Sequence, residues 1–129
     1  MDCIFCLIAA GTIPASKVWE DKGFIAFLDI NPISEGHTLV VPKAHSDYVF
    51  ELDDEAYDGL FRASKSVAKL LKKSLGVKRV GVIVEGFLVP HAHVHLIPMN
   101  SPSEFSPARA RRATPAELEA AAKKIRNGI

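Results

Sequence analysis

The pattern of apolar and polar positions along the chain predicts an α+β fold with a mostly antiparallel sheet. Apolar side chains recur every 3.6 residues over 54–75, which predicts one long helix with Asp53 as its N-cap and Gly76 at its end. Short runs of β-branched and aromatic residues, separated by turn-forming sequences, predict strands. These strands are expected over 17–20, 23–29, 37–41, 79–84 and 92–97.

Two shorter helices are predicted near the ends of the chain. Residues 4–10 are mostly apolar and precede Gly11, and Thr114-Pro115-Ala116-Glu117 is a capping box with proline at the first helical position. The second of these helices is expected to extend to about Asn127, after a loop over 101–113. The 129 residues contain no internal repeat, and this length fits one domain. We expect the core of that domain over 3–98 and a C-terminal loop and helix over 99–129.

Composition and charge narrow the classes of function. Apolar residues make up 48% of the chain, charged residues 24%, and the formal net charge is +1. This charge gives no general attraction to nucleic acid or anionic membranes, so any phosphate recognition requires a local site. The start Met1-Asp2-Cys3 lacks the basic segment of a signal peptide, and no apolar run approaches the ~18 residues of a membrane span. We therefore expect a cytoplasmic protein that has neither membrane nor nucleic-acid partners.

Three of the five histidines, His91, His93 and His95, alternate with apolar residues in one predicted strand. Strand side chains alternate between faces, so these imidazoles are expected on one side, about 6 to 7 Å apart. Such a set is costly to bury unless each ring has a partner, which favours a functional site. Their spread along one strand disfavours a single shared metal ion. It favours a division of labour in which one imidazole attacks and its neighbours bind phosphate oxygens or protonate a leaving group.

The segment from His91 to Pro98 resembles the signature of the histidine-triad (HIT) family, in which three alternating histidines precede hydrophobic residues. Two more segments resemble the family, in the right order: 27–30 followed by 36–45, and 3–8 with Ile13-Pro14, which is similar to the start of bacterial Hint-like members. The resemblance covers about residues 3–98. It implies a HIT-like fold and a nucleotide hydrolase or transferase that acts on phosphoric anhydrides or phosphoramidates.

The resemblance also implies roles for individual histidines. His93 would attack the α-phosphorus of a purine nucleotide and form a covalent nucleotidyl-histidine, which water then hydrolyses. His95 would contact phosphate oxygens and help the leaving group to depart. His37 would orient and polarise the nucleophile, with a buried structural histidine as the alternative. Adenosine phosphoramidates and dinucleoside polyphosphates are the implied substrates.

The nucleotide itself has implied contacts. Asp29 resembles the acidic residue that accepts hydrogen bonds from both ribose hydroxyls, although a residue that turns the chain at a strand end is the alternative. An apolar base pocket would be lined by four residues that could equally be plain core: Phe5, Ile8, Phe27 and Ile30.

The resemblance further implies a metal ion. Members that begin with Cys-x-x-Cys are similar to a zinc-bearing branch, and two thiolates with two imidazoles suit a closed, structural tetrahedral Zn²⁺ site. The alternative is a pair of reduced cysteines without metal. The implied ligands are Cys3, Cys6, His45 and His91.

The chain departs from the family pattern before and after the triad. Val84 stands where the family has asparagine, the loop over 84–90 is several residues shorter and lacks the usual glutamine and serine or threonine, and Met99 replaces a common arginine. Those groups help to bind phosphate and the leaving group. A nucleotide-binding module with weak or lost turnover is therefore an alternative function.

Three questions stay open at the level of sequence. All three triad histidines on one ion would instead make a metallohydrolase. The C-terminal arginines could reach a polyphosphate or form a solvated basic loop. Family resemblance implies a homodimer that pairs the long helices and extends the sheet, and an open edge strand would favour this pairing. The arginines are Arg109, Arg111 and Arg112.

Overall fold

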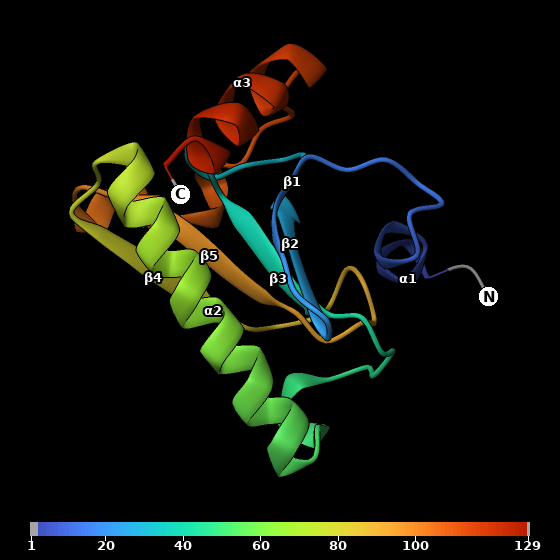
Figure 1. Ribbon diagram of the computed structural model, residues 1–129. Helices are drawn as coiled ribbons and strands as arrows, with labels where there is room; N and C mark the ends of the chain where they lie inside the picture. Colours follow the sequence, from blue (N-terminus) through green and yellow to red (C-terminus); the bar gives the residue numbers. More distant parts are fainter. Residues whose placement is uncertain (1–2, 129) are drawn as a thin grey trace.

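The computed structural model describes residues 3–128 and contains a five-stranded antiparallel sheet in the order β1-β2-β3-β5-β4 (Figure 1). Its strands are β1 (Lys17–Glu20), β2 (Phe24–Leu28), β3 (Thr38–Pro42), β4 (Arg79–Ile83) and β5 (Val94–Met99). Its helices are α1 (Ile4–Ala9), α2 (Asp54–Leu75) and α3 (Pro115–Arg126), with 3-10 turns η1 (Val49–Glu51), η2 (Pro102–Glu104) and η3 (Pro107–Arg109). The predicted α+β class is confirmed. Met1, Asp2 and Ile129 lie outside the described residues. Two expectations therefore fall partly outside them: the one about the start of the chain, and the two end positions of the expected domain.

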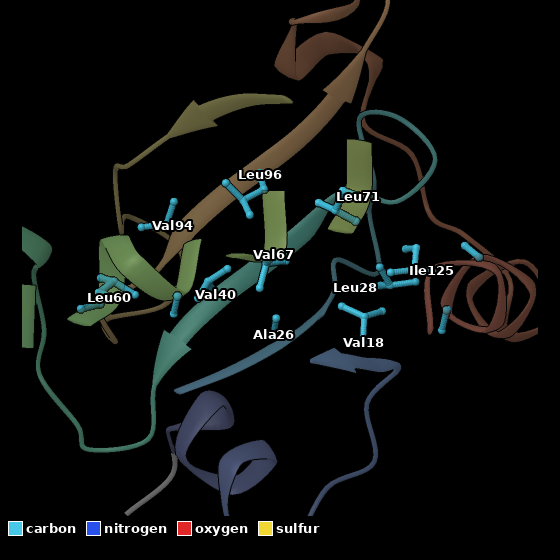
Figure 2. Packing of buried hydrophobic residues seen from close by; sticks show 14 of the residues in the cluster. Val18, Ala26, Leu28, Val40, Leu60, Val67, Leu71, Val94, Leu96 and Ile125 are labelled. Atoms are coloured by element: carbon cyan, nitrogen blue, oxygen red, sulfur yellow. The ribbon is translucent and has the colours of Figure 1, made fainter. Parts of the chain in front are cut away.

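The two faces of the sheet are covered by different helices. Helices α2 and α3 pack on one face, and α1 covers part of the other (Figure 1). Figure 2 shows side chains of α2, such as Leu60 and Val67, opposite Val40 and Val94 of the central strands. Phe5 of α1 packs in a second buried cluster on the other face. Strand β2 is thus buried on both sides, as its continuous apolar sequence predicts.

The alternation of the central strands decides which residues face α1. Ala92, Val94 and Leu96 are buried in the cluster beneath α2, as predicted. Since successive side chains alternate, the odd-numbered neighbours of these residues project to the α1 face. The same alternation places His37 beside Leu39 on this face, because Thr38 and Val40 are on the other. The α1 face therefore collects His95 of β5 together with His37 and His93, which directly precede β3 and β5.

Helix ends agree closely with the predictions, because capping depends on local sequence. The Asp53 carboxylate accepts a hydrogen bond from the Ala56 N–H, and Gly76 ends α2 in the left-handed conformation. Thr114 and Glu117 form the predicted capping box of α3. The loop over 101–113 differs from expectation, since it contains the turns η2 and η3.

Strand boundaries are where the predictions are wrong by one or two residues. The strand expected over 92–97 extends instead from Val94 to Met99. The Ala92 N–H donates to the Ser46 carbonyl oxygen, and the His91 N–H to that of Val89. These bonds keep His91 and Ala92 out of the sheet ladder. Within residues 3–128, none of the helices has the length and apolar character needed to cross a membrane.

Candidate functional site

Four side chains from three segments meet beside α1, where β3 has ended and β5 has not yet begun. The Sγ atom of Cys3 lies 3.3 Å from Nδ1 of His91, and Sγ of Cys6 lies 3.3 Å from Nδ1 of His45 and 3.4 Å from Nδ1 of His91. The two Nδ1 atoms are 3.2 Å apart. All four predicted metal ligands therefore come together, and their donor atoms lie within 4.8 Å of one another.

The chemistry of this donor set fits zinc. A tetrahedral Zn²⁺ with bonds of about 2.3 Å to sulfur and about 2.0–2.1 Å to nitrogen would hold sulfur and nitrogen ligands about 3.5 Å apart and two nitrogens about 3.3 Å apart. Nε2 of the His91 ring donates to the Pro42 carbonyl oxygen, 2.8 Å away. That bond fixes the proton on Nε2 and leaves a lone pair on Nδ1, which faces the cysteines. His91 is thus prepared as a metal ligand, and burial lowers the pKa of its imidazole.

The other two triad histidines lie further along the same face. Nδ1 of His93 lies 2.7 Å from the His91 carbonyl oxygen. A carbonyl only accepts hydrogen bonds, so Nδ1 of His93 carries a proton and Nε2 of the neutral ring carries the lone pair. The Phe5 ring packs nearly perpendicular to this imidazole, with 5.1 Å between ring centroids. One nitrogen of His93 is therefore committed to the backbone and the other is available for chemistry.

His37 and His95 form a chain of hydrogen bonds that begins at the backbone. The Ile33 N–H donates to Nδ1 of His37 at 3.0 Å, so this nitrogen carries no proton. Nε2 of neutral His37 is then protonated and donates to Nδ1 of His95, also at 3.0 Å. The proton of neutral His95 must therefore sit on Nε2. We call these three groups the histidine relay.

Burial keeps the relay neutral. Burial is the largest of the effects that lower the pKa of His37 to about 4. The charge of Asp29 opposes it by raising this pKa, and His95 lowers the pKa as burial does. Burial also lowers the pKa of His95. Nε2 of His95 is buried and has no hydrogen-bond partner. Among the described residues it is the one buried side-chain nitrogen or oxygen atom in this condition. A buried N–H without a hydrogen-bond acceptor costs free energy of folding. An acceptor atom of a bound ligand would remove this cost.

Asp29 lies beside the relay. Its Oδ1 atom accepts a hydrogen bond from the Asn31 N–H at 2.8 Å, while Oδ2 lies 3.6 Å from Nε2 of His37 and 3.9 Å from Nδ1 of His95. Asp29, His37 and His95 are close enough to one another to suggest a second metal site. The tautomer of His37 argues against it, because neither ring nitrogen has a free lone pair: that of Nδ1 accepts from the Ile33 N–H, and Nε2 carries the proton. His37 and His95 are instead joined by a hydrogen bond, with the Asp29 carboxylate beside them.

A cavity of about 890 Å³ opens beside these rings. His93, His95 and Asp29 line it, together with apolar residues of α1 and β2. The predicted base-pocket residues are all in its wall: Phe5, Ile8, Phe27 and Ile30. His37 lies behind the wall, buried against His95. The cavity therefore joins a polar end that carries imidazoles to an apolar end that could receive a flat ring.

The C-terminal segment also reaches this cavity. The Ala113 N–H donates to the Ile30 carbonyl oxygen at 2.9 Å, which holds Arg112 in the cavity wall. Arg109 and Arg111 instead line a neighbouring cavity of about 890 Å³, which shares Asp29 and Arg112 with the first. Of the three arginines named in the sequence analysis, Arg112 alone lines the cavity that His93 and His95 also line.

Comparison with known proteins agrees with this geometry. Residues 10–101 match the family profile described as the HIT domain. The chain belongs to the HIT family. Among its HIT relatives, "Protein hit" of Bacillus subtilis is 41% identical over 102 residues, which span 75% of this chain and 70% of that protein. The adenosine 5′-monophosphoramidase hnt1 of Schizosaccharomyces pombe is 39% identical over 99 residues, 76% of this chain and 74% of that one.

Solved HIT structures share the fold over almost the whole chain. A Hit-like protein from Bartonella henselae superposes with a TM-score of 0.89 at 33% identity, covering 99% of this chain and 96% of that one. A Zn-bound histidine-triad protein from Mycobacterium smegmatis superposes with a TM-score of 0.86 at 28% identity, covering 99% and 93%. The HIT-like fold predicted from sequence is therefore confirmed.

Sequence reasoning left out two groups that the fold brings to the site. The Ile33 N–H sets the tautomers of His37 and His95. It is a backbone donor, so the pattern of side chains in the sequence does not predict it. Glu85, in the loop before the triad, lines the cavity with Oε2 at 3.9 Å from Nε2 of His95. Its only signal in the sequence is its position between a strand and the triad.

Proposed function

We propose that this HIT protein is a nucleotide hydrolase or transferase that cleaves at the α-phosphate of a purine nucleotide through a covalent nucleotidyl-His93. The bond between Nδ1 of His93 and the His91 carbonyl is the observation that carries this proposal. It fixes the proton away from Nε2 and leaves a lone pair there, in a ring that lines the cavity. The name of the related yeast protein, a monophosphoramidase, supports the same class of substrate.

The first step makes and breaks one bond at phosphorus. Nε2 of His93 forms a bond to the α-phosphorus, the bond to the leaving group breaks, and the electron pair departs with that group. In the second step the oxygen of water bonds to the same phosphorus, and the bond from phosphorus to Nε2 of His93 breaks with its electron pair returning to nitrogen. The nucleoside monophosphate leaves, and the proton of water passes to solvent. A transferase would use another nucleophile in place of water.

The histidine relay assists both steps through Nε2 of His95. Because its tautomer is fixed from Ile33, this nitrogen presents a proton to a phosphate oxygen without reorganisation. A non-bridging oxygen would satisfy the buried N–H that has no partner in the protein. His37 is a positioning residue in this scheme, since it acts on the substrate through His95.

The remaining groups bind the nucleoside. One oxygen of Asp29 is held by the Asn31 N–H, and the other is available to accept hydrogen bonds from the ribose hydroxyls. The aromatic and aliphatic wall accepts the base by burial of apolar surface. Its proposed members are Phe5, Ile8, Phe27 and Ile30.

The structural zinc belongs to the same proposal. Cys3, Cys6, His45 and His91 would hold Zn²⁺ as a closed set of four protein ligands. The ion would tie α1 to the segment that precedes β5, and α1 supplies Phe5 to the cavity wall. Its contribution is therefore to the shape of the site. His93 lies outside this group, so the reading in which all three triad histidines share one catalytic ion has no support among the described residues.

The experiment that tests the function is release of monophosphate from a panel of nucleotides. Wild-type protein and His93→Ala are compared on adenosine phosphoramidate, dinucleoside polyphosphates and matched guanosine and cytidine compounds. The proposal expects turnover that depends on His93 and favours purines. Equal turnover in both proteins would refute it.

A second candidate is a nucleotide-binding module with weak turnover. It is favoured by the short loop over 84–90, which lacks the glutamine and serine or threonine expected from family resemblance. It predicts that calorimetry detects nucleotide binding while the panel releases no monophosphate.

We also propose that residues 1–129 form one domain and that the protein is a homodimer. Strand β4 is at an edge of the sheet, and Val82 in it is 50% exposed. A second copy could extend the sheet there and cover this apolar surface. Light scattering coupled to gel filtration tests the mass, and a monomer at micromolar concentration would refute the dimer. The cytoplasmic location stays a prediction.

A further inference from the structure

The carboxylate of Glu85 stands beside the reactive end of the cavity. Its Oε2 atom lies 3.9 Å from Nε2 of His95, the nitrogen assigned to a phosphate oxygen. Its Oε1 atom accepts a hydrogen bond from the Phe87 N–H, which holds the carboxylate in place. The side chain is 33% exposed, so its charge is only partly screened by water.

Two carboxylates lie at opposite sides of the His95 ring. Asp29 is near Nδ1 and Glu85 is near Nε2. If Asp29 binds the ribose, the nucleoside lies at the Nδ1 side, and the bond that breaks lies toward the Nε2 side. Glu85 is therefore placed next to the leaving group rather than next to the nucleoside.

The cationic group in the wall is at the other end. Arg112 reaches the cavity through the segment that is bonded to Ile30, on the nucleoside side. The charged side chains that line the cavity are Asp29, Glu85, Glu119 and Arg112. A polyphosphate leaving group would bring several negative charges toward Glu85, whereas a phosphoramidate protonated on its nitrogen would bring a positive one.

We infer that Glu85 is a specificity-determining residue that selects substrates with an amine leaving group over those with a polyphosphate leaving group. This inference rests on the proposed function. The carboxylate favours the form of a phosphoramidate in which solvent has protonated the nitrogen bonded to phosphorus. When Nε2 of His93 bonds to phosphorus, the phosphorus–nitrogen bond breaks, its electron pair stays on nitrogen, and a neutral amine leaves. The charge balances without a further proton.

The test compares two substrates of one nucleoside, adenosine 5′-phosphoramidate and diadenosine tetraphosphate. The measured quantity is the ratio of their kcat/KM values for wild type, Glu85→Gln and Glu85→Asp. Glu85→Gln keeps the size and the Phe87 hydrogen bond but removes the charge. Glu55→Gln, at an exposed position in the first turn of α2, controls for the change in net charge.

Glu85→Gln is expected to lower the ratio on the order of tenfold, with slower cleavage of the phosphoramidate and equal or faster cleavage of the polyphosphate. Glu85→Asp should retain part of the preference, and Glu55→Gln all of it. High salt should reduce the wild-type ratio and leave that of Glu85→Gln nearly unchanged.

A ratio within twofold of wild type in Glu85→Gln, or an equal loss on both substrates, would overturn the inference. In that case adduct formation on His93 would still stand, so the proposed function would survive. If the wild-type protein forms no adduct, the proposed function fails and this inference fails with it.

Discussion

Nδ1 of His93 lies 2.7 Å from the main-chain carbonyl oxygen of His91, two residues earlier in the chain. The same His91 points its own Nδ1 at Cys3 and Cys6. One residue therefore contributes its side chain to the cysteine–histidine cluster and its backbone to the proposed nucleophile. Any disturbance of the cluster should reach His93 through this single peptide unit.

Replacement of the proposed metal ligand Cys6 tests the cluster from which this connection starts. Cys6→Ser should reduce bound zinc well below one ion per chain and lower the Tm on the order of 10 °C, because metal affinity contributes to folding. Metal analysis and thermal unfolding measure both effects. Cys3→Ser should behave alike. Stoichiometric zinc in either variant would contradict the proposed ligand set.

The pKa of His37 makes stability depend on pH. Burial lowers that pKa from 6.5 to about 4. Between these values the unfolded chain binds a proton at this residue that the folded protein does not, so the free energy of unfolding rises with pH across the window and falls as the solution is acidified. Each unit of lowering corresponds to about 1.4 kcal/mol.

His37→Gln should flatten this dependence between pH 4 and 6.5. Urea unfolding at several pH values in the window measures the slope for both proteins. If the variant keeps the slope of the wild type, His37 is not the buried neutral group described here.

The same variant tests the histidine relay. In His37→Gln the fixed donor to Nδ1 of His95 is lost or displaced, so the tautomer of His95 is no longer set from Ile33. We expect kcat to fall about ten- to a hundredfold with a smaller change in KM, since the effect is on the reacting phosphate. A rise in KM alone would indicate a role in binding only.

Asp29 should select for ribose. Asp29→Asn keeps the acceptor for the Asn31 N–H but removes the charge that would lie beside the ribose hydroxyls. The wild type should prefer a ribonucleotide substrate to its 2′-deoxy analogue in kcat/KM, and the variant should lose most of this preference. An unchanged preference would assign Asp29 to the turn at the end of β2 alone.

The sequence predicts the fold where local rules decide it. The Asp53 cap and the Gly76 end set α2, and the Thr114 capping box sets α3, because each depends on a few neighbouring residues. The start of β5 is not predictable in this way. Ala92 bonds to Ser46, which is far away in sequence, and alternation alone does not show where ladder bonds begin.

Part of the candidate site is likewise predictable from the sequence, and part of it is not. The alternating histidines and the Cys-x-x-Cys pair are visible in the sequence, since strand periodicity and residue type suffice to mark them. The Ile33 N–H and the Glu85 carboxylate act from loops, and the pattern of apolar and polar residues does not show the course of a loop. The direction of each tautomer, and therefore the division between nucleophile and donor, follows from those backbone bonds.

The most direct test of the account is the mass of the intact protein after rapid mixing with adenosine 5′-phosphoramidate and quenching without acid. The wild type should gain the mass of one adenylyl group, and peptide mapping should place it on His93. His93→Ala should gain none and lose at least about a thousandfold in kcat. Turnover by the wild type without any adduct, or an adduct that persists in His93→Ala, would contradict a covalent nucleotidyl-His93.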